Sequence, residues 1–138
     1  MPIQRGVGLA KIPRDRLVCI KQANGAEEAV LTTVPLVINP TTLRLNLSAS
    51  TDGASCAVEL CDPFGRTLPG FSRADCEDMS NVDAIEVRVQ WRNSSCDNSQ
   101  LEHGGGHELE EKMVSQSRGT VKLRVFLNGG ARLYAIYT

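Results

Sequence analysis

Apolar and polar side chains alternate with a period of two along four stretches of this chain, and this alternation constrains the fold more than any other feature. The four stretches are residues 43–48, 56–61, 85–92 and 121–125. Successive side chains of a β-strand point to opposite faces, so a period of two predicts strands with one buried face and one wet face. Residues 133–137 are apolar throughout and predict a more central strand, while residues 16–20 and 36–38 predict two shorter strands.

Residues that favour tight turns separate these stretches. Residues 62–65 read Asp-Pro-Phe-Gly and residues 128–130 read Asn-Gly-Gly, and both are typical of hairpin turns. Residues 39–40 and 50–53 indicate two further turns. Short strands joined by turns predict antiparallel sheets, and sheets with one apolar face bury it by packing in pairs. We therefore predict an all-β protein, a single antiparallel β-sandwich over residues 1–138 of jelly-roll or concanavalin-like type.

One long segment interrupts the strand pattern. Residues 93–106 are polar and Gly-rich, and residues 108–113 have helical character. We predict one long loop over residues 93–119 that contains a short helix. Loops of this length in compact domains are commonly functional.

The composition argues against two classes of partner. Hydrophobic residues make up 41% of the chain, which is enough for a folded core, and the formal net charge is -1. Lysines and arginines are scattered, so no basic patch neutralises a nucleic-acid backbone and we expect no nucleic-acid binding. No stretch approaches the roughly 20 apolar residues that span a bilayer, so we expect no membrane insertion.

The sequence leaves the cellular compartment open. The chain has five cysteines, and an odd number fits a reducing compartment better than a complete disulfide framework, although two disulfides and one free thiol remain an alternative. Residues 1–11 lack the charged start and apolar run of a signal peptide. Asn46 and Asn93 each begin an N-glycosylation acceptor triplet, which keeps a secreted fragment open beside a cytoplasmic protein.

Several motifs occur in an order that resembles a known module. Residues 58–72 read VELCDPFGRTLPGFS, which is a strand, an Asp-containing turn and a Pro-Gly-Phe-Ser piece. An Asp75-Cys76 pair, a strand ending in Trp91 and a last strand with Leu133-Tyr134 follow, and residues 13–17 upstream read PRDRL. This order resembles the C-terminal β-sandwich module of five-bladed propeller glycosidases of the invertase and fructosidase type and their uncharacterised relatives.

The resemblance covers roughly residues 7–137 and implies an accessory module. In those enzymes the catalytic carboxylates lie on the propeller, which this chain does not contain, so we expect no catalytic residues and no cofactor here. Residues 93–119 are longer than the loop of the family, which leaves a binding surface at that place open. Implied partners are a glycan or an adjacent catalytic domain.

Four residues are candidates for ligand binding. Arg14 and Arg16 have the forked donors that suit carboxylate or hydroxyl acceptors, and Asp15 lies between them. Asp75, in the acidic motif, is a further candidate contact for a glycan. The alternative interpretation of Arg14, Asp15 and Arg16 is an ion-paired group that braces the start of a strand.

An acidic cluster and a cysteine near Asp75 raise the question of catalysis. Glycoside hydrolysis requires two carboxylates that face each other across the scissile bond. The cluster of Asp75, Glu77, Asp78 and Asp83 lies in a turn-rich segment, where aspartates commonly cap turns. Acidic neighbours raise the pKa of a thiol such as Cys76 and make it a poorer nucleophile. We therefore predict no catalytic centre in this segment.

His103 and His107 are the candidate metal ligands. Their spacing would place both imidazoles on one side of a helix, where they could share a metal ion. Residues 104–106 are all glycine, and three glycines oppose a helix, so a loop without a metal is the alternative.

Trp91 shares the register of Val87 and Val89, which predicts a place in the core and not on a sugar-binding surface. The main functional hypothesis is thus a non-catalytic accessory module. The second hypothesis is a free-standing structural protein that forms homo-oligomers through its sandwich edges or its last strand.

Overall fold

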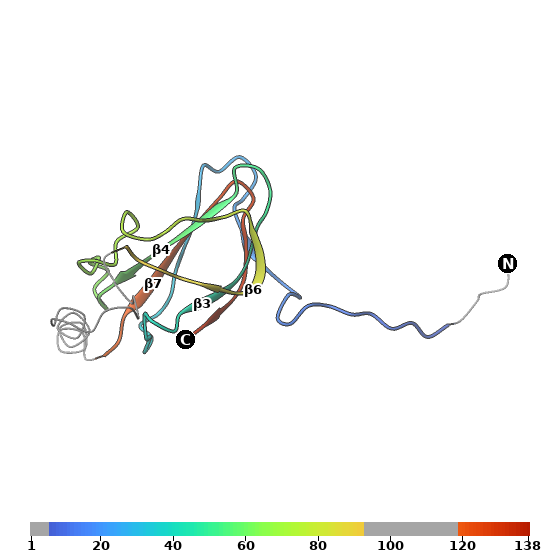
Figure 1. Ribbon diagram of the computed structural model, residues 1–138, viewed down its shortest axis with the longest axis horizontal. Coiled ribbons are helices and arrows are strands. Elements are labelled where there is room, and N and C mark those ends of the chain that lie inside the picture. The colour runs from blue at the N-terminus through green and yellow to red at the C-terminus, as the bar shows by residue number, and fades with distance from the viewer. Residues whose placement is uncertain (1–5, 93–118) are drawn as a thin grey trace, which may run out of the picture.

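The chain is an all-β protein in which two antiparallel sheets pack face to face (Figure 1). The structure is a computed structural model that describes residues 6–92 and 119–138. The strands in these residues are β1 (Ile20–Lys21), β2 (Ala29–Thr32), β3 (Arg44–Ala49), β4 (Ser55–Cys61), β5 (Met79–Ser80), β6 (Val82–Arg88), β7 (Lys122–Asn128) and β8 (Arg132–Tyr137). The predicted helix and nearly all of the predicted loop over residues 93–119 lie outside the described residues.

The order of the strands identifies the sandwich as a jelly roll. The first sheet has the order β1-β8-β3-β6 and the second has the order β2-β7-β4-β5. β1 pairs with β8, β2 with β7, β3 with β6 and β4 with β5. This is the pattern of one long antiparallel hairpin that is rolled up into two sheets. This topology confirms the predicted antiparallel sandwich and places β8 inside the first sheet, between β1 and β3.

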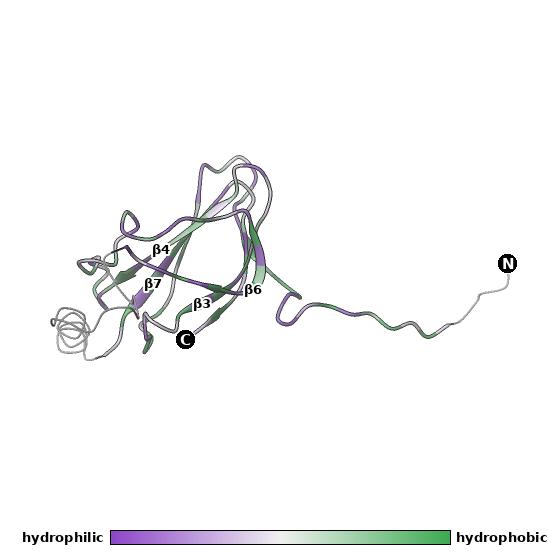
Figure 2. Cartoon of the chain, viewed as in Figure 1, coloured by the Kyte–Doolittle hydropathy of each residue, from purple (hydrophilic) through white to green (hydrophobic). Residues whose placement is uncertain are grey.

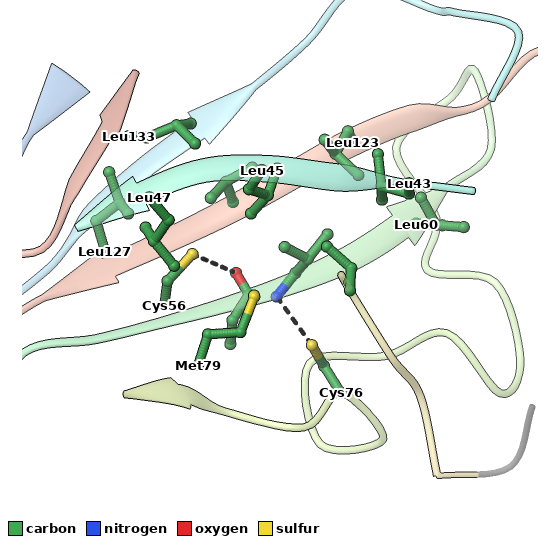
Figure 3. Packing of buried hydrophobic residues seen from close by; sticks show 14 of the residues in the cluster. Leu43, Leu45, Leu47, Cys56, Leu60, Cys76, Met79, Leu123, Leu127 and Leu133 are labelled. Carbon is green, nitrogen blue, oxygen red and sulfur yellow. Dashed lines mark hydrogen bonds between the residues drawn. The ribbon is translucent and has the colours of Figure 1, made fainter. Parts of the chain in front are cut away.

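Aliphatic side chains from both sheets fill the space between the layers. Leu45, Leu47, Val58, Leu123 and Val125 are fully buried. Figure 3 shows the leucines of β3 and β7 and Leu60 of β4 in one cluster. These residues occupy every second position of their strands, so the period-two interpretation assigned their inward faces correctly.

The polar face of β4 differs from the expectation, because it is buried as well. Glu59 is only 7% exposed and Cys61 is not exposed at all. Arg124 on the neighbouring strand β7 forms an ion pair with Glu59 and also donates to the carbonyl of Gly65, 3.4 Å away. A paired carboxylate costs much less to bury than a free one, so this ion pair permits Glu59 to lie under the turn that follows β4.

Other differences concern the short strands. Of residues 16–20 only Ile20 lies in a strand, because Asp15 adopts a left-handed conformation with φ 60° and starts a turn in place of a strand. Leu36 forms a single bridge with Val121 and belongs to no strand. The alternation did not predict β2 or β5, which have four and two residues and are too short to show a period.

Two turns meet at one end of the sandwich and require glycine. Gly129 has a φ of 60°, and a Cβ atom there would lie 2.0 Å from the carbonyl oxygen of Gly53. The hydroxyl of Thr51 donates to the carbonyl of Gly129 at 3.2 Å. The turn between β7 and β8 can therefore approach the turn between β3 and β4 only without a side chain at position 129.

Side chains complete the hydrogen bonds of β4 where its neighbour β5 ends. The Val58 amide donates to Sγ of Cys76 at 3.3 Å, as drawn in Figure 3, and Nε1 of Trp91 donates to the Val58 carbonyl at 3.2 Å. Further along, the Leu60 amide donates to the carbonyl of Phe71 at 3.0 Å. The ring of Phe71 meets Trp91 edge-on at 5.3 Å, and Trp91 is 3% exposed, which confirms its predicted place in the core.

We predict that Cys76→Ala destabilises the protein by about 1–2 kcal/mol more than Cys56→Ala, since it leaves the buried Val58 amide without an acceptor. Both thiols are buried, but the sulfur of Cys56 has only a 4.0 Å contact with the carbonyl of Ala57. Cys56→Ala is therefore the matched control for the lost volume. Urea unfolding under reducing conditions measures both, and equal losses would contradict a structural role for the Cys76 sulfur.

Candidate functional site

Three of the predicted ligand-binding residues lie on the outer face of the first sheet. Residues 13–17 form a turn, closed by a 3.2 Å hydrogen bond from the Arg16 amide to the Pro13 carbonyl. The turn lies over Asn46 of β3, which points outward because its neighbours Leu45 and Leu47 point into the core. Residues 13–17 thus form an exposed turn that is attached to the outer face of the sheet through Arg16 and the Arg14 carbonyl.

Asn46 binds this turn through both ends of its amide. Its Oδ1 accepts from Nε of Arg16 at 2.8 Å, and its Nδ2 donates to the carbonyl of Arg14 at 2.8 Å. Arg16 also forms a 2.5 Å ion pair with Asp83 of β6. Asn46 is completely buried, so these bonds replace all of its contact with water. We call Arg14, Asp15, Arg16, Asn46 and Asp83 the Arg16 network.

The two tyrosines of β8 complete the network. The guanidinium of Arg16 lies 4.8 Å from the ring centre of Tyr134, and that of Arg14 lies 5.2 Å from the ring centre of Tyr137. The Tyr137 hydroxyl donates to the carboxylate of Asp15 at 2.7 Å. Because each ring already has an arginine on one face, these tyrosines are poor platforms for stacking a sugar.

The charges of this face neutralise one another. Arg14 forms a 2.8 Å ion pair with Glu86 of β6, and this hydrogen bond raises the pKa of Arg14 above its ordinary value. Arg44 of β3 lies 3.7 Å from the same carboxylate. The geometry matches the second interpretation of the sequence, an ion-paired group that fixes the chain before β1, and it uses the donors that a ligand would need.

Asp75, the fourth predicted ligand-binding residue, lies in a different part of the fold. Its carboxylate accepts from the hydroxyl of Ser72 at 2.6 Å, and its carbonyl accepts from the Arg92 amide at 2.8 Å. The structure thus brings Arg14, Asp15 and Arg16 together and places Asp75 in the turn that leads to Cys76. In that place its carboxylate caps the turn.

The burial of Asn46 also bears on the first glycosylation triplet. Glycosylation requires an exposed side-chain amide, whereas the amide of Asn46 is buried and bonded at both ends. In the folded protein Asn46 is therefore not an acceptor. Asn93, which begins the second triplet, lies outside the described residues.

We predict that Asn46→Ala destabilises the protein by about 1–3 kcal/mol, because it leaves Arg16 and the Arg14 carbonyl without buried partners. It should also release residues 13–17, so that trypsin cleaves after Arg14 and Arg16 faster than in the unmodified chain. The control is Asn24→Ala, which changes an exposed asparagine in a turn. Equal cleavage of both variants would show that Asn46 does not hold the segment.

A hollow lies on the open side of the sandwich between the edge strands β5 and β6. Its volume is about 220 Å³, and Met79, Val82 and Val87 provide the apolar part of its lining. The polar part is provided by Ser80 and by the longer side chains of Glu77, Asp78, Arg88 and Gln90. β5 and β6 are the edge strands on this side of the sandwich, and β1 and β2 are the edge strands on the opposite side.

The polar side chains of this hollow differ from those of the Arg16 network in having no partners among the residues that the structure describes. Glu77, Asp78, Arg88 and Gln90 are exposed, and within the described part of the chain their side chains form no hydrogen bond or ion pair. Carboxylates accept and guanidinium donates, so the set can bind a polyhydroxylated or charged ligand. Glu77 and Asp78 appeared in the sequence only as members of an acidic cluster, while nothing indicated that Arg88 would join them.

Burial suppresses the reactivity of the inner thiols. It raises the pKa of Cys56 to about 12 and that of Cys76 to about 11, and it also raises the pKa of Cys61. Cys19, Cys56, Cys61 and Cys76 are free, so no two of these described cysteines form a disulfide bond. The buried thiols of Cys56, Cys61 and Cys76 therefore remain protonated at neutral pH and are poor nucleophiles.

We predict that a thiol reagent at neutral pH modifies only Cys19 in folded Cys96→Ser protein, and all four remaining cysteines after denaturation. The unfolded thiols titrate near pH 9.0 and the folded Cys56 thiol near pH 12, so raising the pH above 9.0 should lower the free energy of unfolding. Counting modified thiols by mass spectrometry tests the first expectation. Rapid modification of folded Cys76 would contradict it.

The predicted metal ligands His103 and His107 lie outside the described residues. In residues 6–92 and 119–138, no group of three or more histidine, cysteine, aspartate or glutamate side chains is arranged to hold a metal ion. The same residues contain no helix that is long and apolar enough to cross a bilayer.

Comparisons with protein-family models, curated proteins and solved structures find no match for this chain.

Proposed function

We propose that this chain is a non-catalytic accessory β-sandwich module that binds glycan on its open β5–β6 side or packs there on a catalytic domain. The observation that carries the proposal is the contrast between the two polar clusters. The side chains of the Arg16 network are paired with one another and with Glu86 and Tyr137. In contrast, Glu77, Asp78, Arg88 and Gln90 line a hollow and have no partner among the described residues.

The structural positions of the motif residues support an accessory role. Cys76 and Trp91 complete the edge of β4, and Asp62 accepts from the amides of Phe64 and Arg66 at 2.9 Å. The motifs on which the resemblance to the glycosidase module depends are therefore occupied in building the sandwich. A resemblance of this kind concerns the scaffold, and an accessory module shares a scaffold without sharing a catalytic centre.

The hollow would recognise a glycan mainly through hydrogen bonds. Carboxylates of Glu77 and Asp78 accept from sugar hydroxyls, and the guanidinium of Arg88 donates to ring or hydroxyl oxygens. Met79 and Val87 provide a small apolar surface for the C–H face of a sugar. Only 4% of the chain is aromatic, so recognition without a stacking platform suits this composition.

We predict that the chain binds at least one class of polysaccharide on a glycan array and that Asp78→Asn combined with Arg88→Met weakens this binding about tenfold or more, which corresponds to about 1.4 kcal/mol. Both residues are exposed, so the fold should be retained. Arg132→Met, which removes an exposed charge at the start of β8, is the matched control.

A second experiment tests the packing alternative. The chain is mixed with the catalytic domain of a propeller glycosidase, and association is measured by calorimetry for the unmodified chain and the double variant. A chain that binds neither glycan nor such a domain would contradict the accessory role. Glycan binding that the double variant leaves unchanged would contradict the assignment to the hollow.

A further inference from the structure

The extended segment before the Arg16 network has the pattern of a strand but no neighbour. Val7, Leu9 and Ile12 are 106%, 87% and 55% exposed. A Cβ atom placed on Gly6 or Gly8 would meet nothing within 4 Å, so this segment has open space around it. Figure 1 shows it running away from the sandwich, and Figure 2 shows hydrophobic stretches along it. We call residues 6–12 the arm.

The sandwich holds the arm at its C-terminal end. The Arg16 network fixes residues 13–17 on the outer face of the first sheet, so the direction in which the arm leaves the sandwich is set. Exposed valine and leucine at alternate positions are costly to leave in water, and burying them against another apolar surface is favourable. An arm with this pattern therefore favours addition to the edge of a sheet.

Among the four edge strands of the sandwich, β2 is the best acceptor for the arm. β1 and β5 have two residues each, too few to align a partner strand. β6 has seven residues, but it carries the exposed charges of Asp83, Glu86 and Arg88, which protect an edge against pairing. β2 has four residues, and Val30 in it is 53% exposed.

The chain beyond β2 extends this apolar edge. Val34 and Val37 are 71% and 77% exposed. Exposed Glu27 lies just before β2, and exposed Lys11 lies in the arm, so the two elements also have complementary charges. An extended strand rises roughly 3.3 Å per residue, so the arm reaches roughly 23 Å and can cover β2 and the residues that follow it.

We propose that two copies of this chain form a dimer by exchanging arms, with residues 6–12 of each copy added as a strand to the β2 edge of the other. The Arg16 network directs the arm away from its own sandwich, which is why the acceptor is on a second copy. Reciprocal exchange gives a closed two-fold dimer. The dimer covers the β1–β2 side and leaves the hollow between β5 and β6 open.

Light scattering of the full chain during size-exclusion chromatography tests the proposal. The unmodified chain should have twice the monomer mass, and Val7→Asp combined with Leu9→Asp should raise the dissociation constant of the dimer about tenfold or more. Val30→Asp on the acceptor edge should have the same effect. Phe64→Asp is the matched control, because Phe64 is 86% exposed and lies in neither the arm nor β2.

Crosslinking identifies the two elements that meet. In a Cys19→Ser, Cys96→Ser background, a chain with Leu9→Cys is mixed with a differently tagged chain carrying Val30→Cys, and a short bis-maleimide is added. Heterodimers should form with this pair and not when Phe64→Cys replaces Val30→Cys. A monomeric chain at high concentration, a dimer that neither the arm variant nor Val30→Asp weakens, or equal crosslinking of both pairs would overturn the proposal.

Discussion

The second sheet depends on how the backbone of β4 is hydrogen-bonded along the edge that faces β5. On its other edge β4 pairs with β7 over its whole length, from Ser55 to Cys61. On the edge facing β5, only Ser55 and Cys56 have a strand partner. A buried amide or carbonyl without a partner costs about 1–3 kcal/mol, and Cys76, Trp91 and the chain around Phe71 avoid that cost at Val58 and Leu60.

This requirement explains why the segment between β4 and β5 contains so many turn-forming residues. The segment turns back to contact β4 at Leu68 and Phe71 and again at Cys76. Gly65 and Gly70 adopt positive φ angles of 90° and 81° where it bends. The sequence from Val58 to Trp91 therefore has a mechanical explanation within this chain. It positions a sulfur and an indole nitrogen where a longer β5 would otherwise be needed.

The alternation of side chains was sufficient to predict the architecture, because the inward faces of β3, β4 and β7 follow it strictly. It could not predict β2 or β5, whose few residues pair through backbone atoms. The alternation predicts less about the candidate sites than about the fold. The sequence indicates Arg14 and Arg16 but not their main partner Asn46, which is about thirty residues away and which the alternation places on a wet face. The hollow requires β5 and β6 to share one side of the sandwich, which only the topology establishes.

The rolled hairpin has a consequence for the way the chain folds. β1 pairs with β8, and Asp15 binds a tyrosine that is 122 residues further along. During synthesis neither sheet can be completed until β7 and β8 have left the ribosome, so four of the six strand pairings form late and over long separations. Such a topology folds slowly, and nascent chains expose unpaired apolar edges for longer than a helical protein of the same length would.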